Sequence, residues 1–129
     1  MAKEAGLNYM DIVKDVRAGK FAPIYLLMGD EDYYIDMLSQ FIADNALKAE
    51  ERDFNYDLLY GAETRANDII NVARQYPMMA DRRVVLVREF QSLNDKDTLA
   101  AYAKNPTLST ILILCHKHGK YDSRRALAQ

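Results

Sequence analysis

Pro23-Ile24-Tyr25-Leu26-Leu27-Met28-Gly29-Asp30 is the stretch that decides the fold class of this 129-residue chain. The five residues after the proline are apolar without alternation, which is typical of a strand buried on both faces in a parallel sheet. Gly29 and Asp30 then turn the chain into a helix that we predict from Glu31 to Leu47, with acidic residues in its first turn. A strand that leads directly into a helix is the repeating unit of α/β proteins.

The same order of strand and helix recurs along the chain. We predict further strands at residues 54–60, 83–88 and 110–115, and further helices at residues 9–16, 64–76 and 95–103. Asn8 and Thr64 are the expected helix N-caps, and Gly19 is the expected end of the first helix. This alternation predicts a three-layer, Rossmann-like α/β fold, in which helices flank a parallel sheet of four to five strands.

The composition is that of a single globular domain. Half of the residues are apolar, and the only cysteine, Cys115, cannot form an internal disulfide. The sequence contains no apolar run of membrane-spanning length and no N-terminal signal segment, so we expect a cytoplasmic protein without membrane contact. The last residues, 124–129, are typical of a helix start without a stop signal. We therefore expect the chain to be a fragment of a longer protein, with residues 1–129 as one domain.

Charge is distributed unevenly between the two halves of the chain. Residues 1–63 contain 6 Lys or Arg and 13 Asp or Glu, a net charge of −7, whereas residues 64–129 contain 11 and 6, a net charge of +5. The basic residues of the second half include Arg82, Arg83, Arg88, Lys117, Lys120, Arg124 and Arg125. A solvated face explains such a cluster, and so does a nonspecific contact with nucleic acid near the carboxyl ends of the strands.

The loop after the first strand is where many α/β proteins hold phosphate, through a glycine-rich turn and a lysine. Here residues 28–34 contain one glycine, three consecutive acids and no Lys-Ser or Lys-Thr pair. Because the acids repel phosphate, we predict neither nucleotide hydrolysis nor a bound cofactor at this loop. Asp30, Glu31 and Asp32 are explained as residues that start the helix and offset its dipole.

Two clusters of residues invite a metal interpretation. The same three acids would suit Mg²⁺ in a receiver-type phosphotransfer domain, but the third strand ends in Arg88-Glu89-Phe90 where such a domain needs an acceptor aspartate. Cys115-His116-Lys117-His118 supplies at most three ligands, and strand alternation points Cys115 and His116 to opposite faces. We therefore expect a buried thiol, two surface histidines and no metal site.

Gln75-Tyr76-Pro77-Met78-Met79-Ala80-Asp81-Arg82-Arg83 places two large apolar residues between a proline and a strand. The proline ends the preceding helix, so Met78 and Met79 fall on a short turn. Methionine often fills gaps, and the pair can fold back over the edge of the sheet as core. Alternatively, the flexible thioethers form a hydrophobic wedge that inserts into a pocket on a partner. Composition alone leaves both alternatives open.

An ordered set of segments resembles the N-terminal domain of the delta subunit of the bacterial DNA polymerase III clamp loader, over essentially the whole chain. The segments are residues 23–31, Gly61-Ala62-Glu63, residues 73–87, Asn105-Pro106 and the basic tail from Lys117 to Arg125. The resemblance implies an AAA+-like fold that has lost its nucleotide site. It also implies a role in DNA replication that is not catalytic, so that a DNA polymerase label would reflect membership of the holoenzyme.

The resemblance further implies a function for the methionines. In this family the apolar pair at the positions of Met78 and Met79, often Leu-Phe, enters a hydrophobic pocket of the ring-shaped sliding clamp and helps the ring to open. Tyr76, Pro77 and Arg82 would rim or orient this wedge.

The resemblance also implies the partners of the domain. They are the clamp (beta subunit), the other clamp-loader subunits through the missing C-terminal region, and primer-template DNA. The residues available for a DNA or subunit contact are Lys117, Lys120, Arg124 and Arg125. A receiver-like domain or a generic nucleic-acid-binding module is the alternative function.

Overall fold

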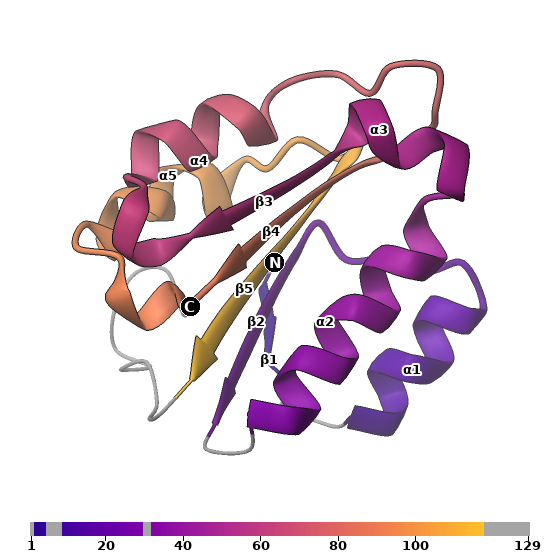
Figure 1. Cartoon of the computed structure of the whole chain (residues 1–129), viewed down its shortest axis with the longest axis horizontal. Coiled ribbons are helices and arrows are strands. Elements are labelled where there is room, and N and C mark those ends of the chain that lie inside the picture. The colour runs from indigo at the N-terminus through magenta and orange to yellow at the C-terminus, as the bar shows by residue number, and fades with distance from the viewer. Residues whose placement is uncertain (1, 5–8, 30–31, 118–129) are drawn as a thin grey trace.

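The computed structural model describes residues 2–4, 9–29 and 32–117. Its centre is a five-stranded sheet in which all paired strands are parallel (Figure 1). The strands are β1 (Ala2–Glu4), β2 (Ile24–Gly29), β3 (Tyr56–Tyr60), β4 (Arg83–Arg88) and β5 (Thr110–Lys117), in the spatial order β1-β2-β5-β4-β3. The predicted parallel sheet of four to five strands is confirmed. The segment that forms β1 was not predicted, because three residues carry too little pattern to indicate a strand.

Helices cover both faces of the sheet. The α-helices are α1 (Tyr9–Arg17), α2 (Asp32–Ala46), α3 (Arg52–Asn55), α4 (Ala66–Ala73) and α5 (Ala100–Lys104). Short 3₁₀ helices span Ala49–Glu51, Gly61–Glu63, Phe90–Ser92 and Lys96–Leu99. Figure 1 shows α1 and α2 on one side of the sheet and α4 and α5 on the other, which is the predicted three-layer arrangement.

Alternate residues of the central strands belong to two separate apolar clusters, one on each face of the sheet. Tyr25 and Leu27 of β2 join one cluster with α1 and α2, while Ile24 and Leu26 join the other with α4 and α5. All four side chains are at most 1% exposed. The continuous apolar run of β2 is therefore buried on both faces, as its sequence predicted.

Because all paired strands are parallel, they all begin at one end of the sheet, called the amino edge, and all finish at the other, called the carboxyl edge. At the amino edge, the loops that enter β3, β4 and β5 lie beside one another, because these strands are neighbours in the order β3-β4-β5. At the carboxyl edge lie the ends of β2, β4 and β5, where open α/β sheets usually bind ligands. In Figure 1 the arrowheads mark the carboxyl edge, and the loop from α4 to β4 passes over the amino edge towards α3.

Several element boundaries differ from the predicted ones. Phe54 lies in α3, and the second predicted strand begins at Tyr56 instead. Thr64 does not cap α4; the Asp95 carboxylate accepts a hydrogen bond from the Ala66 N–H at 3.0 Å, so a distant residue caps this helix. Gly19 ends α1 with φ of +77°, as predicted. Asn8, Asp30 and Glu31 lie outside the described residues.

Candidate functional site

The segment from Gln75 to Arg82, called the methionine turn below, joins α4 to β4 at the amino edge of the sheet. Helix α4 ends at Ala73, before Pro77, as the sequence predicted. Met79 is 96% exposed and Met78 is 57% exposed. Neither methionine fills the core, so the core-filling alternative is wrong in this structure. Tyr76, in the same turn, is 82% exposed.

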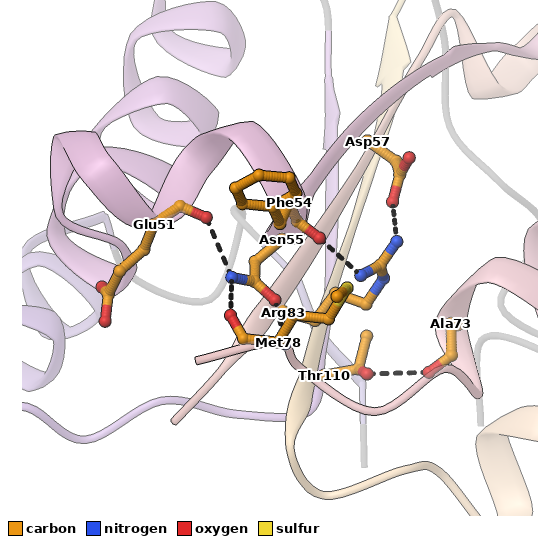
Figure 2. Close-up of polar contacts among 8 residues, drawn as sticks. All are labelled: Glu51, Phe54, Asn55, Asp57, Ala73, Met78, Arg83 and Thr110. Atoms are coloured by element: carbon orange, nitrogen blue, oxygen red, sulfur yellow. Dashed lines mark hydrogen bonds and ion pairs between the residues drawn. The ribbon is translucent and has the colours of Figure 1, made fainter. Parts of the chain in front are cut away.

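A buried asparagine holds the backbone of this turn (Figure 2). The Asn55 side chain is fully buried at the end of α3, although it is polar. Its Oδ1 accepts a hydrogen bond from the Met78 N–H at 2.6 Å, and its Nδ2 donates to the Met78 carbonyl at 2.8 Å. Nδ2 also donates to the Glu51 carbonyl at 2.9 Å, which ties the amide to its own helical segment. The methionine side chains are therefore exposed on a backbone that is fixed.

Two further contacts fix the chain on either side of the turn. Before it, the Thr110 hydroxyl donates to the Ala73 carbonyl at 2.7 Å in a buried position. After it, the Arg83 guanidinium donates to the Phe54 carbonyl at 3.0 Å and to the Asp57 carboxylate at 2.7 Å. Figure 2 shows Arg83 bonded to Phe54 of α3 and to Asp57 of β3, and Thr110 of β5 bonded to Ala73. The sequence pattern indicates Arg83 only as part of a basic cluster and gives no indication of Asn55.

Arg82 is the last residue of the methionine turn, directly before β4. Its guanidinium is 4.5 Å from the centroid of the Phe21 ring, and it donates to the Gly19 carbonyl at 3.5 Å. This half-buried side chain therefore packs against the segment between α1 and β2. Arg82 thus joins the end of the methionine turn to the segment between α1 and β2.

The carboxyl edge carries the other candidate residues. Arg88 ends β4 and donates from its guanidinium to the Asp36 carboxylate of α2 at 3.0 Å. Lys117 ends β5, as expected, whereas Lys120, Arg124 and Arg125 lie outside the described residues. The structure thus separates Arg88 and Lys117 from the methionine turn by the length of the strands.

The predicted burial of Cys115 and exposure of His116, at the end of β5, are only partly correct. Cys115 is buried against the cluster of α1 and α2, as predicted. His116 faces the opposite layer, but it is buried and not on the surface, with its ring centroid 6.1 Å from that of Phe90. His116 is buried because β5 is a central strand and residues 90–92 cover its end. His118 lies outside the described residues, and those that are described contain no group of three potential metal ligands.

Two tyrosines have shifted acidity. Burial raises the pKa of Tyr102 above its ordinary value of 10.0, while the hydrogen bond from the Thr107 N–H and the nearby Arg74 guanidinium partly lower it. Burial likewise raises the pKa of Tyr56, and the Arg52 guanidinium, 4.7 Å from its ring centroid, partly offsets the effect. Both phenols are therefore protonated at neutral pH, and neither can serve as a base there.

Comparison with known proteins assigns the chain to a family. A family model described as DNA polymerase III, delta subunit, matches residues 25–129. The chain belongs to the DNA polymerase III delta subunit family. The matched region includes Asn55, the methionine turn and the two contacts that flank the turn. The family resemblance inferred from the sequence is confirmed.

One delta relative is DNA polymerase III subunit delta of Bacillus subtilis, which is 26% identical over 129 residues. The alignment covers 92% of this chain and 37% of the relative, so the chain spans little more than a third of that protein's length. A solved structure of the Bacillus subtilis DNA clamp loader delta protein has a TM-score of 0.83 and 24% identity, covering 94% of this chain and 39% of that chain.

A more distant solved structure has the same fold. A RuvB mutant from Thermotoga maritima gives a TM-score of 0.54 at 14% identity, over 85% of this chain and 36% of that chain. The delta chain is therefore Rossmann-like and AAA+-like in fold. Among the described helices of this delta chain, none combines the length and the apolar character needed to cross a bilayer.

Proposed function

We propose that this chain is a domain of a clamp-loader delta subunit that binds the sliding clamp through Met78 and Met79 and helps to open the ring during DNA replication. The observation that carries the proposal is the exposure of both methionine side chains, 57% and 96%, on a turn whose backbone is held by buried groups. Exposed apolar side chains on a fixed backbone favour binding, because the backbone loses little conformational entropy when a partner binds.

The physical driving force is the burial of the two thioethers. Moving an apolar side chain of this size from water into a hydrophobic pocket contributes about 1.5 to 3 kcal/mol. Methionine side chains have several rotatable bonds, so the pair can adapt to the shape of a pocket. Tyr76 and Pro77 extend the same surface, and Arg82 supports it from the side of Phe21.

The domain itself is proposed to be non-catalytic and to bind no cofactor. Residues 28–34 offer three consecutive acids and no lysine to a phosphate group, which opposes ATP binding at the usual position in this fold. ATP hydrolysis in sibling subunits would then govern when the methionines meet the clamp. A polymerase label would describe the holoenzyme to which the subunit contributes.

The proposal includes further partners through regions beyond this domain. The chain would be one N-terminal domain of the delta subunit, whose remaining length joins the other clamp-loader subunits. Primer-template DNA or a neighbouring subunit would be contacted by the basic residues at the carboxyl edge and after it, namely Lys117, Lys120, Arg124 and Arg125.

Replacing Met78 and Met79 together by alanine tests the proposed function. We expect the dissociation constant for the organism's own sliding clamp, measured by calorimetric titration, to rise at least about 30-fold, or about 2 kcal/mol, because both anchors are removed. The melting temperature should hardly change, since both side chains are exposed.

Met10→Ala is the matched control for this experiment. Met10 is 63% exposed on α1, so its removal takes away a comparable exposed thioether elsewhere on the molecule. Affinity for the clamp should stay within about twofold of wild type. An unchanged affinity of the Met78 and Met79 double variant would sink the proposal. Strongly salt-dependent DNA binding without clamp binding would favour the nucleic-acid module instead.

A further inference from the structure

We propose that Asn55 is a positioning residue for clamp binding: its buried side-chain amide holds the backbone of Met78 and so presents the methionine pair. This inference rests on the proposed function, because it assigns to Asn55 the task of orienting the same surface. The hydrogen bonds of its amide reach the backbone of Glu51 and of Met78, not a methionine side chain. Its effect passes through the main chain of the turn.

Burial is the first argument for this role. Asn55 is one of few polar residues with no exposure among those described, and it ends a helix of only four residues. Burying an amide is unfavourable unless its polar atoms form hydrogen bonds. Here both ends of the amide are satisfied, and two of its three hydrogen bonds go to the same distant residue, Met78.

The geometry of these bonds is the second argument. Oδ1 accepts from the Met78 N–H and Nδ2 donates to the Met78 carbonyl, at 2.6 Å and 2.8 Å. The amide thus pairs with both backbone groups of one residue, as a neighbouring strand would, although Met78 belongs to no strand or helix. Rotation about the backbone of Met78 would break at least one of the two bonds.

The residue after Met78 has a backbone conformation that needs support. Met79 has φ of 55°, a left-handed conformation that residues with a side chain adopt only when neighbouring structure holds them. In this conformation the Met79 side chain is almost entirely exposed. Without the amide of Asn55, the turn would sample other conformations and would have to be ordered when the clamp binds, which weakens affinity.

The first measurement concerns the free chain and needs no clamp. In Asn55→Ala, hydrogen exchange at the Met78 amide, followed residue by residue by NMR, should be at least about tenfold faster than in wild type, because the N–H loses its buried acceptor. An unchanged exchange rate at Met78 would overturn the inference, whatever the chain binds.

The second measurement is affinity for the sliding clamp. Asn55→Ala should weaken binding about tenfold. The isosteric Asn55→Asp keeps an acceptor for the Met78 N–H but places a second oxygen against the carbonyls of both Met78 and Glu51, so its affinity should also fall below that of wild type. The aspartate variant preserves the volume of the site, so a cavity cannot account for its loss of affinity.

Leu93→Ala separates positioning from general loss of stability. Leu93 is 1% exposed and follows β4 at the carboxyl edge, so its truncation weakens the core without touching the methionine turn or the groups that hold it. Its melting temperature should fall, while its affinity for the clamp stays within twofold of wild type. If Asn55→Ala and Leu93→Ala lose affinity equally at equal loss of stability, Asn55 is only a structural residue.

The two proposals can fail separately. A wild-type chain that does not bind the clamp refutes the proposed function, and the exchange rates of the Met78 amide then decide whether Asn55 holds the turn. A wild-type chain that binds, together with an Asn55→Ala variant of equal affinity, refutes the positioning role alone.

Discussion

Met79 has a backbone conformation that its side chain disfavours. Among the described residues, only Met79 and Glu89 combine a positive φ with a side chain, at 55° and 53°. Positive φ suits glycine, because a Cβ atom crowds the neighbouring carbonyl. The position that exposes the methionine therefore costs stability, and the hydrogen bonds of Asn55 offset part of that cost.

This conformation predicts different stabilities for two truncations of Met79. Met79→Gly should have a free energy of unfolding about 1 kcal/mol higher than Met79→Ala, because glycine adopts positive φ without strain. Both variants lack the thioether, so both should lose affinity for the clamp to a similar degree. Urea denaturation compares the stabilities, and equal values would show that the turn relaxes away from positive φ when the side chain is shortened.

At the scale of elements, the segments that follow β3 and β4 pack closely at the carboxyl edge. Gly61 begins the 3₁₀ helix after β3 and is buried against the backbone of Glu89, which follows β4. A Cβ atom at Gly61 would overlap the Glu89 carbonyl oxygen and would lie 3.1 Å from the Leu93 nitrogen. Backbone atoms cannot move aside as a flexible side chain can, so only glycine fits this contact.

Gly61→Ala should therefore lower the free energy of unfolding by about 2 to 3 kcal/mol, as overpacking does. Gly19→Ala is the control, because Gly19 has φ of +77° but open space around the position of a Cβ atom. That control should cost only about 1 kcal/mol from conformational strain. Thermal denaturation of the two variants checks the difference; a smaller loss for Gly61→Ala than for Gly19→Ala would contradict the close contact.

At the scale of the whole molecule, the proposed clamp surface and the conventional ligand edge are separate. The methionine turn precedes β4 at the amino edge, whereas Arg88 is the last residue of the same strand, at the carboxyl edge. The strand residues between them, Val84 to Val87, are fully buried. The exposed surfaces at the two edges are therefore not joined along β4. A surface at the amino edge leaves the carboxyl edge available for other contacts.

Arg88→Ala should therefore leave affinity for the clamp within about twofold of wild type. The ion pair with Asp36 is partly exposed, at 24% and 43% of the two side chains, so its loss should lower the free energy of unfolding by less than about 1 kcal/mol. The same calorimetric titration that tests the methionines measures the effect. A tenfold loss of affinity would mean that the clamp also reaches the carboxyl edge.

Local sequence was sufficient for much of this architecture. The unbroken apolar run in β2 predicts burial on both faces, and the proline before the methionines predicts that α4 ends and that the pair lies outside it. These predictions succeeded because their causes lie within a few residues of each other. The predicted cap at Thr64 was wrong because the competing Asp95 is 29 residues away from Ala66 in sequence.

The sequence by itself thus determined the kind of fold, the approximate positions of most elements and the place of Met78 and Met79 on a turn outside α4. Only the tertiary structure decided the order of the strands, the exposure of the two methionines, the burial of His116 and the pairing of Asn55 with Met78 across 23 residues. Periodicity and helix-ending signals act over one or two turns of chain, so they leave a record in the local sequence. A hydrogen bond between distant segments leaves none, because it forms only after packing has brought α3 and the methionine turn together.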